Sequence, residues 1–321
     1  MNSMPFKTAW MFRNRHFQTI WPALFRYIAK PAYRRERIEL CDGDFIDIDW
    51  CGNDKNNPPV AILLHGLEGS SDSQYIRGLV KALSDMGWRC AAINFRGCSG
   101  ELNRLPRSYH SGATDDLDEI IRLLVRRYPD SVLQAVGFSL GGNVLLKWCA
   151  ETAHNCPLNA AVAVSVPYRL AVASKKLDNG HVFSRLYRWR LLRSLKNKAL
   201  KKIQHGRLNM DESYIHSIKS LYDFDDLITA PLHGFKDADD YYRIASSYSK
   251  LNNIQIPVLL LHAADDPFMD SRVIPETAVE DNSIRLELSP HGGHVGFYQP
   301  SFNFSSYWLE RRIPDFLKTM I

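Results

Sequence analysis

No stretch of this sequence is long and apolar enough to be a membrane-spanning segment. Residues 1–30 are aromatic and apolar in places, but arginines, His16 and Pro22 interrupt them before a signal-peptide core or a span of ~18 residues could form. We therefore expect neither export nor a spanning helix. The favoured interpretation is an amphipathic stretch lying on the protein body, and peripheral contact with a lipid surface is the alternative.

Sequence signatures of several other classes of protein are also missing. No CxxC pair and no HExxH or similar ligand spacing is present, so we expect neither a disulfide framework nor a metal site. The formal net charge of +5 is too small to make nucleic acid a leading partner. Reduced thiols and a cytoplasmic location are therefore expected for the six scattered cysteines, which are Cys41, Cys51, Cys90, Cys98, Cys149 and Cys156.

What the sequence does contain is the alternation of an α/β protein. Residues 37–50 show period-two patterning around Asp42-Gly43, which predicts an antiparallel hairpin near the amino terminus. Apolar strand-like runs then alternate with helical patterns, which predicts a mostly parallel, doubly wound sheet. The predicted strands cover residues 60–64, 90–95, 132–136 and 160–166, and the predicted helices cover residues 73–86, 113–127 and about 140–150.

The alternation of strand and helix patterns stops after Val166, and about eighty residues pass before the next buried-strand signal at 256–262. We interpret residues 167–250 as an inserted helical lid, with a core formed by 1–166 and 251–321. Within the lid, residues 184–207 contain many basic and no acidic residues, with leucines at helical intervals. This pattern predicts an amphipathic helix that packs its leucines on the core, and contact with anionic lipid or substrate is the alternative. A last strand at 283–289 and a closing helix at 302–317 complete the chain.

Gly137, Ser139 and Gly141 form a GxSxG motif between an apolar strand-like run and a helix-like segment. A nucleophilic serine on a sharp strand-to-helix turn tolerates only small residues two positions to either side. The spacing and its context predict a nucleophile elbow with Ser139 as the nucleophile.

A serine needs a base to take its proton and a carboxylate to orient that base. Enzymes with this elbow carry the acid and then the histidine later in the chain, each on a loop after a strand. Asp265 and Asp266 follow the strand at 256–262 and are both candidates for the acid. His291 and His294 are candidates for the base, and His294 is favoured because His291 directly follows Pro290 and is interpreted as structural.

Two backbone N–H groups must stabilise the oxyanion, one from the residue after the nucleophile and one from the loop after an early strand. These positions are Leu140 and Leu67. The remaining histidines His65, His110 and His262 are interpreted as loop or core residues.

Seven segments together make the chain resemble the YheT-like branch of the α/β-hydrolase superfamily, often called the AB hydrolase 4 family. They are NRHFQTIWP, HGLEGSSDSQYIRGL, NFRGCSGE, GFSLGGNVLLKW, YDFDDLITAPLHGFKDADDYY, ADDPF and HGGHVGF. The resemblance implies the α/β-hydrolase fold and carboxylesterase activity on short- or medium-chain acyl esters, and eukaryotic relatives handle acylglycerols, ethyl esters or phospholipids. It also selects Asp266 as the acid, because Ala263 and Asp266 match the superfamily's loop spacing.

The resulting hypothesis is a serine esterase that forms an acyl-enzyme on Ser139, with His294 as base, Asp266 as orienting acid and no cofactor. Its partner is a small-molecule acyl ester. The alternatives are an acyltransferase with the same triad and a non-catalytic binding protein on the same fold. Asp223, Asp225 and Asp226 lie in a lid-return segment that precedes the strand at 256–262. We expect this segment to anchor the lid to the core, and we do not expect its carboxylates to act as the acid.

Overall fold

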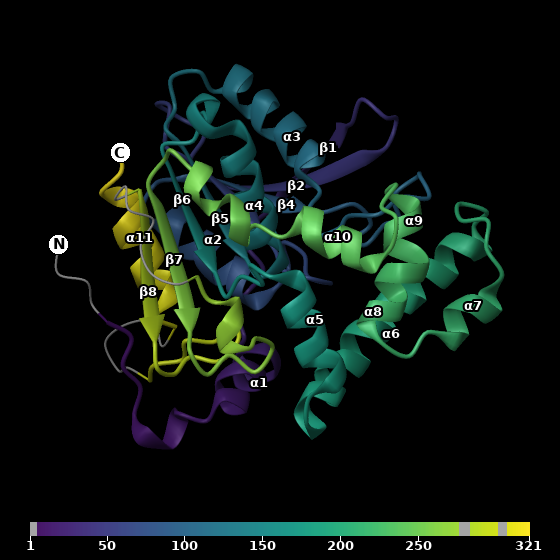
Figure 1. Cartoon of the computed structure of the whole chain (residues 1–321). Coiled ribbons are helices and arrows are strands. Elements are labelled where there is room, and N and C mark those ends of the chain that lie inside the picture. The colour runs from purple at the N-terminus through teal and green to yellow at the C-terminus, as the bar shows by residue number, and fades with distance from the viewer. Residues whose placement is uncertain (1–4, 276–282, 301–306) are drawn as a thin grey trace.

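The computed structural model describes residues 5–275, 283–300 and 307–321. Within these ranges, eight strands form one sheet in the order β1-β2-β4-β3-β5-β6-β7-β8 (Figure 1). The pairs β1·β2 and β2·β4 are antiparallel and the other neighbours are parallel, which confirms the predicted sheet. The strands are β1 Arg34–Glu39, β2 Phe45–Gly52, β3 Val60–Leu64, β4 Arg89–Asn94, β5 Leu133–Phe138, β6 Ala160–Val164, β7 Val258–Ala263 and β8 Ile284–Ser289.

Helices cover both faces of the sheet because the central strands are apolar on both sides. In β3, Ile62 and Leu64 belong to the apolar cluster beneath α3 and α4, whereas Ala61 and Leu63 belong to the cluster beneath α2 and α11. The covering helices are α2 Gln74–Asp85, α3 Thr114–Arg127, α4 Leu140–Thr152 and α11 Leu309–Lys318. Residues 302–306 of the predicted closing helix lie outside the described residues, and the helix is seen from Leu309 onward.

The predicted hairpin between β1 and β2 is present, with Gly43 in the left-handed region at φ +83°. Beyond it, the parallel strands β3, β5, β7 and β8 all end at the same edge of the sheet. The loops after these strands carry Leu67, Ser139, Asp266 and His294. The topology therefore gathers the predicted site residues at one edge.

Between β6 and β7 the chain forms a group of helices with an apolar cluster of its own, seen to one side of the sheet in Figure 1. The stretch predicted as an amphipathic helix is α6, whose Leu192 is buried in that cluster. The elements are α5 Leu170–Asn179, α6 Val182–Gln204, α7 Glu212–Ser217, α8 Leu221–Phe224, the π-helical turn η3 Asp225–Thr229, α9 Ala230–Leu232, α10 Ala238–Ala245 and the 3-10 helix η4 Tyr248–Asn253.

The amino-terminal segment forms a short helix that lies against the core. It contains the 3-10 turn η1 Trp10–Phe12 and the helix α1 Arg15–Phe25, capped by the Asn14 side chain. The other 3-10 turns are η2 Ala153–Asn155 and η5 Ser271–Val273. In the three described ranges, no helix combines the length and apolar character needed to cross a membrane.

Candidate active site

Ser139 occupies the turn between β5 and α4 in a strained backbone conformation, with φ +50° and ψ −118°. The flanking glycines are required by close packing. A Cβ atom on Gly137 would lie 2.5 Å from the carbonyl oxygen of Gly141, and one on Gly141 would lie 2.5 Å from the carbonyl oxygen of His65. The GxSxG spacing therefore reflects a turn that no larger residue could complete.

Three predicted site residues meet in one hydrogen-bonded chain. His294 Nε2 lies 3.0 Å from Ser139 Oγ, and His294 Nδ1 lies 2.8 Å from Asp266 Oδ2. Asp266 is 2% exposed, so its carboxylate interacts with the imidazole away from water. This is the connectivity that proton transfer from a serine hydroxyl requires.

The Asp266 loop also fixes the orientation of the histidine ring. Asp266 Oδ1 accepts a hydrogen bond of 2.8 Å from the backbone N–H of Phe268. The Phe268 ring stacks on the His294 ring, with centroids 4.1 Å apart and planes 6° from parallel. The imidazole is therefore held by its edge and by its face.

The alternative acid and base pair with each other instead. His291 Nδ1 lies 3.3 Å from Asp265 Oδ2, while Asp265 Oδ1 accepts a hydrogen bond of 3.0 Å from the Gly293 N–H. Burial raises the pKa of Asp265. This second pair joins the loop after β7 to the loop after β8, next to the first.

Leu67 and Leu140 lie where oxyanion donors are expected. Leu140 is the first residue of α4, and Leu67 follows Gly66, at which a Cβ atom would be 3.2 Å from Ser139 Cβ. Both residues line the same cavity as Ser139. Among the described residues, none accepts a hydrogen bond from either backbone N–H, so both donors are available to a bound group.

His65 holds the loop that carries Leu67. Burial lowers the pKa of His65 to about 4, so the ring is neutral near pH 7. It lies 2.7 Å from the Gly66 carbonyl through Nδ1 and accepts a hydrogen bond from the Phe95 N–H through Nε2. These contacts place the proton on Nδ1 and assign His65 the structural role expected of it.

Helix α1 positions the histidine loop, which the sequence did not reveal. Thr19 Oγ1 accepts a hydrogen bond of 2.9 Å from the His294 N–H. The fully buried Gln18 accepts from the Tyr298 N–H at 2.7 Å and donates to the Tyr298 and Phe12 carbonyls. The NRHFQTIWP motif was the only sequence signal in this segment, and it forms the Asn14 cap and the first eight residues of α1.

The carboxylates of residues 222–242 form no hydrogen bond with Ser139 or His294 among the described residues. The segment itself contacts the core, as expected: His233 Nε2 lies 2.8 Å from the Ser108 carbonyl, and the Tyr241 hydroxyl accepts a hydrogen bond of 2.9 Å from the Ser111 N–H. Asp225 accepts hydrogen bonds from Tyr242 and Thr229, and burial raises its pKa to about 6. Asp226 accepts from the Ala238 N–H, and Asp223 closes a capping box at the start of α8. All these partners lie within residues 167–250, so the carboxylates stabilise that segment internally.

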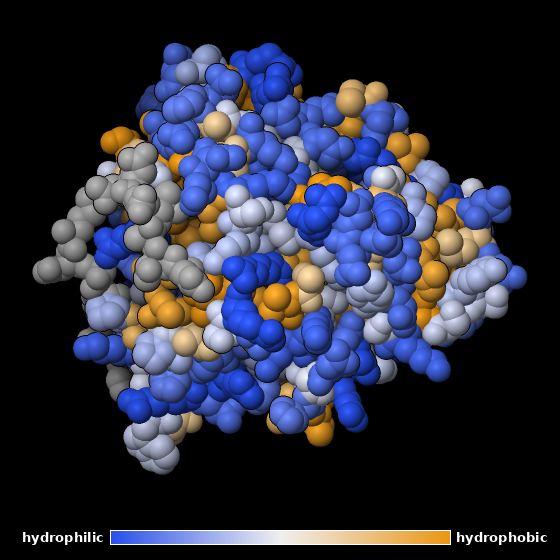
Figure 2. All heavy atoms as spheres, in the orientation of Figure 1, coloured by the Kyte–Doolittle hydropathy of each residue, from blue (hydrophilic) through white to orange (hydrophobic). Residues whose placement is uncertain are grey.

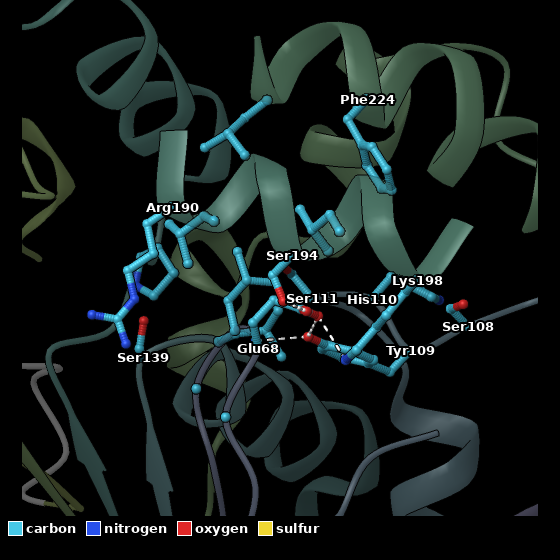
Figure 3. Close-up of a pocket in the computed structure, with 18 of the residues that line it drawn as sticks. Glu68, Ser108, Tyr109, His110, Ser111, Ser139, Arg190, Ser194, Lys198 and Phe224 are labelled. Atoms are coloured by element: carbon cyan, nitrogen blue, oxygen red, sulfur yellow. Dashed lines mark hydrogen bonds and ion pairs between the residues drawn. The ribbon is translucent and has the colours of Figure 1, made fainter. Parts of the chain in front are cut away.

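A cavity of about 700 Å³ extends from Ser139 beneath helices of residues 167–250 (Figure 3). Its wall includes Glu68, which accepts hydrogen bonds from Tyr109 and Ser194 and pairs with Lys198 at 2.9 Å. Figure 3 shows Arg190 extending from α6 on the side where Ser139 lies. The described residues contain no cluster of side chains that could hold a metal ion.

The sequence model of the alpha/beta hydrolase fold family matches residues 59–300. The chain therefore belongs to this family. A solved structure of a Pyrococcus furiosus esterase is similar in fold, with a TM-score of 0.56, 18% identity and coverage of 89% of this chain and 92% of that one.

Two curated relatives define the branch. The chain is 43% identical over 314 residues to the Escherichia coli (strain K12) protein named "Putative esterase YheT", covering 97% of this chain and 92% of that protein. It is 32% identical over 333 residues to "Phospholipase ABHD3" of Mus musculus, covering 98% of this chain and 78% of that protein. The chain is thus a member of the YheT-like branch of the α/β hydrolases.

Proposed function

We propose that this protein is a serine hydrolase that cleaves carboxylic esters through an acyl-enzyme on Ser139. The observation that carries the proposal is the hydrogen-bonded chain from Ser139 through His294 to Asp266 at the wall of a cavity. The relatives named as an esterase and a phospholipase support ester cleavage.

In the first half of the reaction, His294 Nε2 removes the proton from Ser139 Oγ as the oxygen attacks the ester carbonyl. The Leu67 and Leu140 N–H groups stabilise the oxyanion of the tetrahedral intermediate, and Asp266 stabilises the imidazolium. His294 then donates the proton to the leaving alcohol, which leaves the acyl group on Ser139.

In the second half, His294 removes a proton from water, and the hydroxide oxygen attacks the acyl carbonyl. Collapse of the second intermediate releases the carboxylic acid and returns the proton to Ser139. Every proton in this cycle is carried by residues of the chain and by water.

We take residues 167–250 as the lid that limits the acyl group. A volume of about 700 Å³ lies in the range of small-molecule pockets, which favours short- and medium-chain acyl esters. Apolar lid residues such as Leu177, Leu191 and Phe224 line it and supply contacts for an acyl chain.

The test is hydrolysis of p-nitrophenyl esters from acetate to palmitate by the wild type and Ser139→Ala. We expect wild-type turnover to be highest at short or medium chain lengths and to fall by about 10⁶-fold in Ser139→Ala. Ser249→Ala, at an exposed serine of η4, is the matched control and should leave the rate unchanged. Full activity in Ser139→Ala would refute the assignment, and exclusive formation of a new ester from an added alcohol would assign acyl transfer instead.

A further inference from the structure

Large exposed apolar side chains concentrate in two segments of this chain. Of the seventeen such side chains among the described residues, ten lie at residues 10–27 and 182–189, and these ten include every exposed tryptophan. We name this set the aromatic face. It comprises Trp10, Met11, Trp21, Leu24, Phe25, Tyr27, Val182, Phe183, Leu186 and Trp189.

The two segments form one surface. The His16 ring of α1 stacks on the Phe183 ring of α6 with centroids 4.0 Å apart, and His16 Nδ1 lies 3.0 Å from the Tyr187 hydroxyl. In Figure 1 both helices reach the lower edge of the molecule, and Figure 2 shows apolar colour at that edge where α5 meets α6. Within α1, Trp21 packs against Phe25 with ring centroids 4.7 Å apart.

The two segments that carry the aromatic face bear charge of one sign. Residues 5–35 contain no aspartate or glutamate, and neither does α6. The exposed arginines on these segments include Arg13, Arg15, Arg185 and Arg190. The acidic groups that reach the first segment from other elements are already paired, Asp72 with Lys30 and Arg77, and Glu310 with Arg26.

The same two helices form part of the wall of the Ser139 cavity. Ile20 and Leu24 of α1 and Tyr187 and Arg190 of α6 all line it. A surface in contact with the aromatic face would therefore lie against the helices that bound the candidate active site.

Together these features identify the partner by its chemistry. Exposed tryptophans beside arginines are favoured at the boundary between lipid headgroups and acyl chains, where the ring is buried and the charge meets phosphate. We propose that the aromatic face docks on the surface of an anionic lipid bilayer. Access of membrane-derived esters to the cavity rests on the proposed function, whereas the docking does not.

The test is co-sedimentation of the full chain with vesicles of phosphatidylcholine and phosphatidylglycerol at 7:3, compared with pure phosphatidylcholine. We expect binding to the anionic vesicles that weakens in pure phosphatidylcholine and at high salt. Replacing Arg13, Arg15 and Arg185 with glutamine should weaken binding by about fivefold for each charge removed. The double variant Phe25→Ser/Trp189→Ser should weaken it by about tenfold for each ring.

Control variants make changes of the same kind elsewhere on the surface. Arg122→Gln/Arg126→Gln on α3 removes exposed charges, and Met86→Ser/Tyr214→Ser removes exposed apolar groups. Both controls should bind vesicles like the wild type. All variants of the aromatic face should hydrolyse a soluble short-chain ester at the wild-type rate, which separates loss of docking from loss of folding or chemistry.

Ser139→Ala removes the proposed chemistry but keeps the aromatic face, so it should bind vesicles like the wild type. Docking and catalysis can therefore fail independently. Absence of binding to anionic vesicles, equal binding to neutral ones, or wild-type binding by the aromatic-face variants would overturn the proposal. A dimer in sedimentation velocity that these variants convert to monomers would also overturn it, by assigning the face to a second copy of the chain.

Discussion

Replacing Asp266 with asparagine tests the site most selectively, because it keeps the side-chain shape and removes only the charge. Asparagine Oδ1 can still accept the hydrogen bond from the Phe268 N–H, which turns its NH₂ group toward His294 Nδ1. Nδ1 must then accept, so the ring carries its proton on Nε2 and cannot take one from Ser139.

The expected cost is about 10⁴-fold in kcat, equivalent to about 5 kcal/mol of transition-state stabilisation. Asp266 does not line the cavity, so KM should change little. The assay is steady-state hydrolysis of p-nitrophenyl butyrate, with thermal unfolding as a check on folding.

Asp265→Asn is the matched control. Its remaining oxygen can still accept from the Gly293 N–H, and its partner His291 has no hydrogen bond to Ser139 among the described residues. We expect kcat within about tenfold of the wild type. A larger loss in Asp265→Asn than in Asp266→Asn would refute the assignment of roles.

Two further predictions address the histidine loop and the buried core. Gln18→Ala leaves the Tyr298 N–H without its acceptor, which should cost about 1–3 kcal/mol of unfolding free energy and lower kcat more than it changes KM. An unchanged kcat would show that the Gln18 contacts do not position the histidine loop. His262 is fully buried, and burial lowers its pKa to about 4, below the value of about 6.5 expected when unfolded. As the pH falls, the unfolded chain therefore binds a proton at His262 before the folded protein does. The stabilisation of the folded state by neutral His262 is complete above pH 6.5 and is lost as the pH falls toward 4, which lowers the free energy of unfolding by about 2 kcal/mol between pH 7 and pH 5. Urea unfolding of His262→Leu should lack this part of the pH dependence, and an identical dependence would contradict the reasoning.

The sequence predicted the features that depend on local chemistry. The Gly137 and Gly141 spacing around Ser139 is imposed by contacts within a few ångströms of the turn, so it is visible in a short motif. The order of strands and helices followed from apolar periodicity for the same reason. The cytoplasmic location expected from the cysteines stays a prediction.

Other features depend on contacts between distant residues. Asp265 and Asp266 are neighbours, and the loop conformation decides which of them faces His294, so the residues alone left both open and the resemblance made the choice. The contact between Thr19 and His294 joins residues 275 positions apart. No periodicity or spacing encodes such a contact, so the role of α1 emerged only from the structure.

The central claim is that Ser139 is the nucleophile. Its most direct test is mass spectrometry of the protein after reaction with a fluorophosphonate, followed by peptide mapping. The account predicts one adduct, on the Ser139 side chain, and none in Ser139→Ala. An unmodified wild type, or an adduct on another residue that persists in Ser139→Ala, would contradict it.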